Sequence, residues 1–189
     1  MTDAIILIGI KHSGKSTQGK LLAKKSDRIF IDLDDVITEL SGKTPREIYN
    51  SSGKDAFIQA EFLACEKVFS DYSGAKTVIA TGGGICDNQK ALEILSKMGK
   101  FVFLNVEEQI ALSRILKKVV FEDGIWQNLP AYIAKENPSS QKEIQEIFHQ
   151  YYKRRTNLYS KIADFTINLS QNDKEQNSVL ILDFIKKQV

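Results

Sequence analysis

Short apolar runs, mostly of β-branched and aromatic residues, alternate along the chain with amphipathic stretches. Each run has about the length of a strand and little alternation of apolar with polar positions, which is typical of strands buried on both faces of a parallel sheet. We therefore predict five strands. They span residues 4–10, 28–31, 77–80, 101–106 and 165–169.

The stretches between these runs have the apolar spacing of helices. The clearest start signal is Thr44-Pro45-Arg46-Glu47, with a threonine cap, proline in the first helical position and glutamate near the third. Alternating strands and helices predict an α/β protein of three layers, with a parallel five-stranded sheet flanked by helices and right-handed crossovers. Helices are predicted at residues 15–25, 55–69, 88–98, 107–118, 141–162 and 174–187.

Residues 121–140 fit this pattern worst. They contain Gly124, Trp126, Pro130 and Pro138, and their apolar positions have only a weak period. A mobile lid and an irregular surface insertion both have sequences of this kind. We predict a lid within residues 117–140 and a single domain over residues 1–189.

Composition narrows the classes of function. The 189 residues suit about one domain, and 42% hydrophobic with 26% charged residues is ordinary for a soluble globular protein. A net charge of +2 gives no reason to expect a nucleic-acid partner. The first apolar run follows Asp3 instead of a basic signal-peptide region, and no run approaches the roughly 20 residues of a membrane span. We expect a cytoplasmic monomer that acts on a small molecule, with Cys65 and Cys86 as buried structural thiols.

A phosphate-binding motif lies between the first predicted strand and the first predicted helix. The residues from Gly9 to Thr17 match G-x-x-x-x-G-K-[ST] in the strand–loop–helix context that the motif requires. Backbone N–H groups of such a loop and the helix N-terminus hold the phosphates of ATP, while Lys15 reaches the β- and γ-phosphates and the Ser16 hydroxyl ligates Mg²⁺. The predicted ATP-binding residues of the loop are His12, Ser13, Gly14, Lys15, Ser16 and Thr17.

The side chain of His12 has two interpretations. It either points outward from the loop, where the backbone bends closely around phosphate, or touches the nucleotide.

Two carboxylates, Asp32 and Asp34, follow the second predicted strand. Residues two apart on an extended segment point the same way, and ligands of open α/β sheets bind beyond the carboxyl ends of strands. The pair is therefore either a site for Mg²⁺ and a substrate hydroxyl or a pair of solvated acids that cap the next helix.

Three consecutive glycines, at positions 82–84, follow Thr81 at the end of the third predicted strand. They either allow a close approach of the backbone to a ligand or form a flexible connector.

Taken together, these residues resemble the shikimate kinase family of small P-loop kinases. The family pattern fits without a gap from Gly9 to Glu61, and it continues through glycines 82–84 to Arg114 and Arg155. The resemblance implies a P-loop kinase fold that binds ATP and Mg²⁺. It also implies transfer of the γ-phosphoryl group of ATP to shikimate, giving 3-phosphoshikimate in aromatic amino acid biosynthesis.

The resemblance further implies residue roles. Lys15 stabilises the transferring charge, and Asp34 contacts the substrate hydroxyls and acts as the base. Ser16 and Asp32 hold Mg²⁺, while Arg114 joins the ATP-binding residues. Arg155 pairs with the substrate carboxylate, which suits a planar guanidinium fork, although from the residues alone it is also a surface charge on a basic helix. The implied substrate-binding residues, partly on helices within residues 34–62, are Asp34, Glu61, Gly82, Gly83, Gly84 and Arg155.

The chain departs from the family pattern within the loop and at the substrate site. The family has glycine where His12 stands, and an acid where Lys54 stands. Its second carboxylate-binding arginine falls at Ile58. Lys54, four residues earlier on the same helix face, is the candidate replacement for that arginine.

A further departure concerns the lid. The family's lid arginine, followed by proline, falls at Phe121-Glu122. Lys117 and Lys118 lie nearby and are candidate replacements, although lysine lacks the planar fork of arginine.

Three hypotheses follow from these observations. The first is a shikimate kinase with a rearranged substrate clamp. The second is a kinase of this fold for a different small hydroxylated acceptor, because Ile58 replaces a charged anchor by an apolar contact. The third is a nucleotide-binding protein with little phosphotransfer, because the lid arginine is absent.

Overall fold

Five parallel strands form the central sheet of the computed structural model, which describes residues 3–122, 124–169 and 173–188. The strand order is β2-β3-β1-β4-β7, so β1 lies in the middle and every pairing is parallel. This arrangement confirms the predicted fold class. The strands are β1 (Ala4–Ile8), β2 (Ile29–Asp32), β3 (Thr77–Ala80), β4 (Gly99–Val106) and β7 (Phe165–Leu169).

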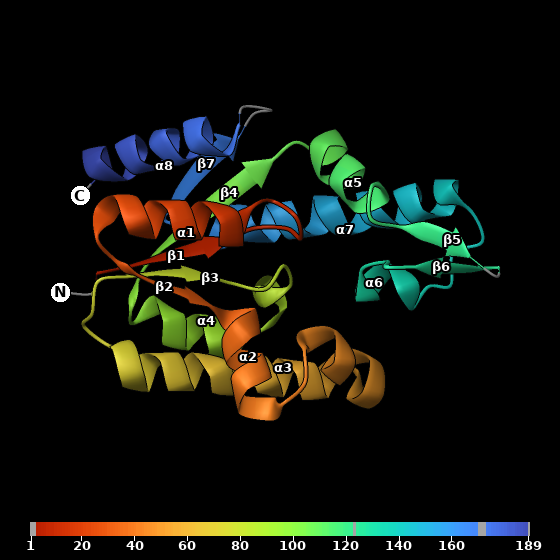
Figure 1. Cartoon of the computed structure of the whole chain (residues 1–189), viewed down its shortest axis with the longest axis horizontal. Coiled ribbons are helices and arrows are strands. Elements are labelled where there is room, and N and C mark those ends of the chain that lie inside the picture. The colour runs from red at the N-terminus through yellow and green to blue at the C-terminus, as the bar shows by residue number, and fades with distance from the viewer. Residues whose placement is uncertain (1–2, 123, 170–172, 189) are drawn as a thin grey trace.

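Helices cover both faces of this sheet. On one face α1 (Lys15–Ser26) crosses β1, β2 and β3 and packs on α8 (Lys174–Gln188), while α7 (Gln141–Ile162) runs behind the sheet against β4 (Figure 1). Next to β4 also lies α4 (Gln89–Ser96), which follows the short 3-10 helix η1 (Ile85–Asp87). The helix α5 (Glu108–Leu116) packs on α7.

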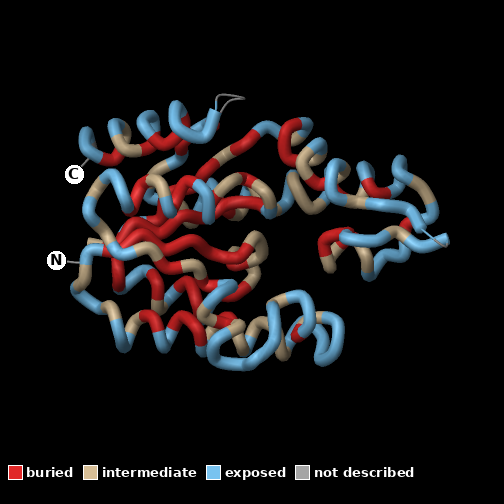
Figure 2. The backbone as a smooth tube through the Cα atoms, in the orientation of Figure 1, coloured by how far each residue is buried: buried red, intermediate tan, exposed pale blue. Residues whose placement is uncertain are grey.

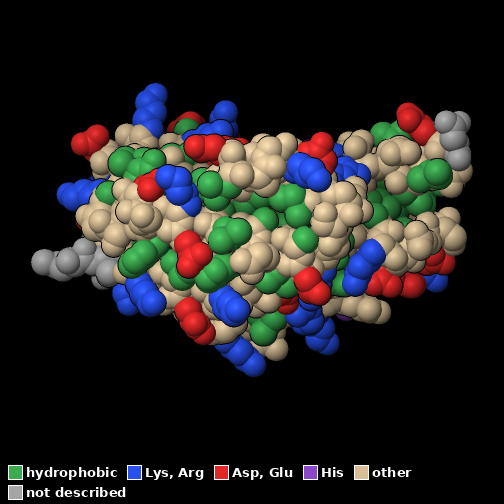
Figure 3. Space-filling model, turned by 90° about the horizontal axis from the view of Figure 1, so that it is seen from below, with side chains coloured by type: hydrophobic (Ala, Val, Ile, Leu, Met, Phe, Trp, Pro, Cys, Tyr) green, Lys and Arg blue, Asp and Glu red, His purple; other side chains and the backbone are tan. Residues whose placement is uncertain are grey.

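The core lies within the sheet and beneath these helices. All residues of β1 and β3 are buried, as the apolar runs predict (Figure 2). Cys65 is buried and Cys86 is half-buried, and both are free thiols. Acidic and basic side chains are interspersed over the face seen in Figure 3. Within the described residues, no helix has the length and apolar character of a membrane span.

The helix α3 (Pro45–Tyr72) joins the predicted helix start at Thr44 to the predicted helix at residues 55–69. Thr44 and Glu47 form the expected capping box, in which each side chain accepts a hydrogen bond from the backbone N–H of the other. Gly53 interrupts the helix with φ 83°, a left-handed conformation that favours glycine. The kink turns the first turns of α3 relative to the longer part that carries Glu61.

The sequence analysis gave no bounds for α2 (Leu33–Ser41), which starts directly after β2. Asp32 is its N-cap, and the Asp32 carboxylate accepts a hydrogen bond from the Asp34 backbone N–H at 3.1 Å. Asp34 therefore lies in the first helical turn, and the argument from alternation along an extended segment was wrong for this pair. Capping, the alternative interpretation, holds for Asp32.

Residues 120–122 and 124–134 include regular secondary structure where the sequence shows only weak periodicity. The strands β5 (Val120–Glu122) and β6 (Ile125–Gln127) pair as an antiparallel hairpin, and α6 (Ala131–Ala134) follows. The rings of Phe121 and Trp126 lie 4.7 Å apart across the hairpin. Each strand has only three residues, too few for alternation to register as a pattern, which explains why the hairpin was not predicted. It projects from the same end of the sheet as α5 (Figure 1).

Gly99 provides a test of the sheet register. It pairs with Ala4, and a Cβ atom at position 99 would lie 1.8 Å from the Ala4 carbonyl oxygen. We expect Gly99→Ala to lower the free energy of unfolding by about 2 kcal/mol or more, because β4 must move away from β1. Urea unfolding measures this. The exposed Lys97→Ala should change it by less than about 0.5 kcal/mol, and an equally small effect of Gly99→Ala would contradict the register.

Candidate active site

A cavity of about 520 Å³ opens at the carboxyl ends of β1 and β3. This is where ligands bind in open α/β sheets. Its walls come from the phosphate loop, the starts of α2 and α3, the glycine segment after β3, and the helices α6 and α7. The candidate functional side chains reach it from these separate elements.

The phosphate loop encloses the ammonium group of Lys15. Its Nζ donates hydrogen bonds to the carbonyl oxygens of Gly9 at 2.9 Å and Ile10 at 2.8 Å. Burial lowers the pKa of Lys15 to about 8, against the attraction of Asp34 and Asp32, which raises it. Gly9 must be glycine here, because its φ is 147° and a Cβ would lie 2.9 Å from the Leu104 carbonyl oxygen.

His12 lies in the loop with φ 65°, the left-handed region where the family has glycine. Its carbonyl oxygen accepts a hydrogen bond from Arg114 Nη1 at 2.9 Å, and the residue lines the cavity. Burial and the charge of Lys118 lower the pKa of His12 to about 4, so the imidazole is neutral at pH 7. A contact of His12 with nucleotide stays a prediction.

Asp34 lines the cavity from the first turn of α2. Burial and the neighbouring charge of Asp32 raise the pKa of Asp34, while Lys15 and Lys11 lower it. A carboxylate with a raised pKa accepts a proton more readily, which suits the predicted role as base. Ser16 and Thr17 also line the cavity, whereas Ser13, Asp32 and Arg114 are not among the described residues that line it.

The three glycines 82–84 all line the cavity. Other parts of the protein approach their backbone closely. A Cβ at Gly83 would lie 2.7 Å from the backbone nitrogen of Lys11, and one at Gly82 would lie 3.0 Å from Glu61 Oε1. The segment is thus packed between the phosphate loop and α3, and the flexible-connector interpretation was wrong.

Arg155 reaches the cavity from α7 and is mostly buried, with 11% of its side chain exposed. Its guanidinium lies over the rings of Tyr132, at 4.7 Å, and Tyr151, at 5.4 Å. Its Nη2 lies 3.4 Å from Asp87 Oδ2, and its Nε has no partner among the described residues. The surface-charge interpretation of Arg155 was therefore wrong.

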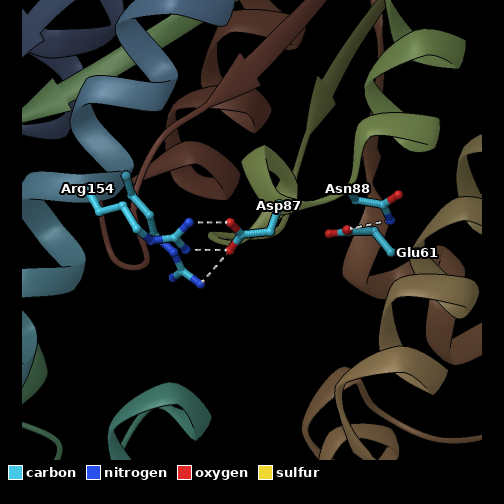
Figure 4. A network of polar contacts seen from close by, with 5 residues as sticks. Glu61, Asp87, Asn88 and Arg154 are labelled. Atoms are coloured by element: carbon cyan, nitrogen blue, oxygen red, sulfur yellow. Dashed lines mark hydrogen bonds and ion pairs between the residues drawn. The ribbon is translucent and has the colours of Figure 1, made fainter.

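Asp87 also binds the neighbouring Arg154 through a two-pronged contact at 2.8 and 2.9 Å (Figure 4). Burial alone would raise the pKa of Asp87, but the hydrogen bonds from Arg154 and the charges of both arginines lower it. Asp87 is therefore an anion that already occupies one arginine fork at the cavity wall.

Glu61, on α3, is buried beside this network. Its Oε2 accepts a hydrogen bond from Asn88 Nδ2 at 3.0 Å (Figure 4), and its Oε1, which faces Gly82, has no partner among the described residues. Burial raises the pKa of Glu61 to about 7, despite the hydrogen bond from Asn88. Near neutral pH this carboxyl group therefore takes up a proton readily.

Comparisons with known proteins show the family of the chain. A family model described as shikimate kinase matches residues 11–186. This chain belongs to the shikimate kinase family. Shikimate kinases of Lactococcus lactis subsp. lactis and of Sulfurihydrogenibium sp. are similar to it, at 33% identity over 92% of both chains and 28% identity over 97% and 98% of them.

Solved shikimate kinase structures share the fold along the whole chain. One from Acinetobacter baumannii, in complex with shikimate, has a TM-score of 0.78 and 26% identity, covering 100% of this chain and 95% of its own. One from Bacteroides thetaiotaomicron has a TM-score of 0.77 and 26% identity, covering 97% and 98%.

The helix α3 contributes cations to the wall of the cavity. Ile58 lines it where the family pattern has arginine, and Lys54 and Arg46 line it from the same helix α3. Arg46 has no ion-pair or hydrogen-bonding partner in the described ranges of the chain.

The lid differs as well. Phe121 and Glu122 lie on the exposed strand β5, and neither of them lines the cavity. Instead Lys118 lines the cavity from the segment after α5, and Lys135 lines it from the turn after α6, while Lys117 does not line it. Among the candidate lid replacements, only Lys118 is therefore in place.

Sequence reasoning missed Lys11, Arg46 and Asp87 as cavity residues, and it missed the hydrogen bond from Asn88 to Glu61. Lys11 occupies a position that the loop motif leaves variable. Arg46 was interpreted only as part of the helix-start signal at residues 44–47. A signal was present for Asn88, whose side chain caps α4 by accepting from the Ala91 N–H. The ion pair of Asp87 with Arg154 joins positions 67 residues apart and had no sequence signal.

The buried carboxyl of Glu61 makes stability depend on pH. Its pKa is about 7 when folded and near its ordinary value of 4.5 when unfolded, so the folded state binds more protons between these pH values. The contribution of Glu61 to stability is therefore fully present below pH 4.5, and it is lost as the pH rises through about 7. We expect Glu61→Gln to be more stable than the unaltered chain at pH 8, by up to about 3 kcal/mol, and to gain little at pH 4.5.

Urea unfolding at both pH values measures this difference. The matched control is Glu66→Gln, at an exposed position of the same helix, which should show no such dependence on pH. Equal gains of Glu61→Gln at both pH values would contradict the assignment.

Proposed function

We propose that this chain transfers the γ-phosphoryl group of ATP to a hydroxyl of shikimate, giving 3-phosphoshikimate and ADP. The observation that carries the proposal is the cavity itself, which is lined by the phosphate loop with Lys15, by Asp34 of α2 and by Arg155 of α7. Membership of the shikimate kinase family supports shikimate as the acceptor. The proposed setting is the cytoplasm.

The phosphate loop end suits ATP. Three loop and helix-start residues that line the cavity, Gly14, Ser16 and Thr17, present backbone N–H groups and hydroxyls at the N-terminus of α1. On binding, the phosphates would take over the hydrogen bonds that Lys15 now makes to Gly9 and Ile10. Lys15 would then neutralise charge on the β- and γ-phosphates.

The residues present fit Mg²⁺. Ser16 offers a hydroxyl at the cavity wall, and the charges of Asp32 and Asp34 both act on the nearby Lys15. Oxygen ligands of this kind suit Mg²⁺, which usually keeps waters and binds through one or two protein groups together with phosphates. When bound, Mg²⁺ would supply further positive charge for the phosphates. We propose Ser16 and Asp32 as the protein residues that hold it.

The Arg155 end suits a carboxylate. Arg155 has an unpartnered buried Nε, and its ring contacts with Tyr132 and Tyr151 fix the plane of its guanidinium. A carboxylate that accepts from Nε and one terminal nitrogen would complete the fork. Glu61 Oε1, beside Gly82, is the free acceptor for a hydroxyl of the same ligand.

The transfer follows from this arrangement. The acceptor oxygen forms a bond to the γ-phosphorus, the bond from phosphorus to the bridging oxygen of ADP breaks with its electron pair, and the hydroxyl proton passes to Asp34. Residues 117–140 are proposed to close over the cavity, because α6 and the residue after it supply part of its wall. Closure would exclude water, which protects ATP from hydrolysis.

A different acceptor is the second candidate function, and Asp87 is the observation that favours it. This anion holds Arg154 and contacts Arg155 in the wall where a substrate carboxylate would bind. Ile58 adds an apolar surface beside it. Both features weaken the case for an acceptor with a carboxylate and favour a neutral polyol.

The proposed function predicts release of ADP that depends on shikimate. Lys15→Ala should lower kcat by about 10³-fold or more, because Lys15 carries the charge at the transferring phosphate, and Asp34→Asn should lower it by about 10²-fold. A coupled assay for ADP, with and without shikimate, measures both. ADP release at the same rate with and without shikimate would contradict the proposal. ADP release that another alcohol stimulates and shikimate does not would favour the second candidate.

The departure at position 58 gives a separate test. We expect Ile58→Arg to lower KM for shikimate by about tenfold or more, because the new guanidinium adds charged hydrogen bonds to the substrate carboxylate. Ile58→Met, which keeps an apolar side chain of similar volume, is the control and should change KM by less than about threefold. No change in KM for Ile58→Arg would indicate that the carboxylate of shikimate does not bind beside α3.

A further inference from the structure

Lys11 is a cation of the phosphate loop that the motif leaves unspecified. It lines the cavity and has no hydrogen bond or ion pair with any described residue. Its backbone is fixed in place, because Gly83 packs directly on its nitrogen and Cα. A free ammonium group on a fixed backbone is thus presented to the cavity.

Charged groups from several walls of the cavity act on the ammonium group of Lys11. Asp34, the proposed base on α2, attracts it most strongly, and Arg46 of α3, Lys118 after α5 and Arg155 of α7 repel it. The charges that act on Lys11 therefore come from four separate segments that line the cavity. Burial between these walls lowers the pKa of Lys11, and the attraction of Asp34 opposes this effect.

The transferring phosphoryl group must pass between the phosphate loop and the oxygen whose proton goes to Asp34. Lys11 belongs to that loop and lines the same cavity as Asp34, and the two charges attract each other, so the ammonium group is available to this path. The arginines that line the cavity are Arg46, Arg154 and Arg155, and the last two contact Asp87. None of the cavity-lining arginines in the described ranges comes from the lid segment 117–140.

We propose that Lys11 is a catalytic residue, whose ammonium group neutralises the oxygens of the phosphoryl group while it moves from ADP to the acceptor. The inference rests on the proposed phosphotransfer. The bond to the acceptor oxygen forms and the bond to the bridging oxygen of ADP breaks, with the proton going to Asp34, and Lys11 keeps its own protons throughout. Lys11 of the phosphate loop would thus supply the positive charge that an arginine of a closing lid would otherwise supply.

The test compares Lys11→Met, which keeps the length and removes the charge, with Lys11→Arg, which keeps the charge. The control is Lys24→Met, at an exposed position of α1 away from the cavity. Lys11→Met should lower kcat by about 10²-fold and leave KM for ATP and shikimate within about threefold, because the contact is made in the transition state. Lys11→Arg should keep kcat within about tenfold of the unaltered chain.

A second readout does not depend on the acceptor. ADP with aluminium fluoride and Mg²⁺ mimics the transferring phosphoryl group, and its affinity should fall at least tenfold in Lys11→Met while that of ADP alone is unchanged. Unchanged ADP affinity also shows that the variant folds. Equal affinity of Lys11→Met and the unaltered chain for the mimic would overturn the role of Lys11, whether or not shikimate is the acceptor. Inactivity of the unaltered chain toward shikimate would instead count against the proposed function alone.

Discussion

The buried ammonium group of Lys15 is the interaction around which the site is organised. A cation in the interior needs oxygen partners, and the carbonyls of Gly9 and Ile10 supply them only because the loop curls around the side chain. That curl requires Gly9 at φ 147° between β1 and α1. The parallel sheet in turn places β1 at its centre, so the loop opens at the carboxyl ends of the strands, next to Asp34 and the glycine segment.

Charge balance explains much of the remaining arrangement. Among the described residues, the cavity is lined by cations from the phosphate loop, α3, the lid segment and α7, and by three acids, Asp34, Glu61 and Asp87. Asp87 holds the two arginines of α7, whereas Glu61 has an unpartnered oxygen and a raised pKa. The surplus of positive charge suits a polyanion such as ATP. The mixture of a free arginine edge and a protonatable carboxyl group suits an acceptor that carries both a carboxylate and hydroxyls.

The sequence predicted the sheet, the main helices and the phosphate loop because these depend on local patterns. Apolar runs define the buried strands, and the spacing of Gly9, Gly14 and Lys15 defines the loop. The predicted orientation of Asp34 was wrong, because the start of α2 directly after β2 has no sequence signal besides the cap Asp32 itself. The β5–β6 hairpin was missed because its strands are too short for periodicity, and the pairing of Asp87 with Arg154 because it depends on how η1 meets α7 in three dimensions.

The central claim is that the cavity delivers the γ-phosphoryl group of ATP to an alcohol and not to water. Phosphorus NMR of the protein mixed with ATP, Mg²⁺ and shikimate tests this most directly, because it follows the phosphorus itself. The account predicts that the γ-phosphate signal is replaced by that of a phosphate monoester coupled to one ring proton of shikimate. Replacement by inorganic phosphate alone, or a γ-phosphate signal that persists, would contradict it.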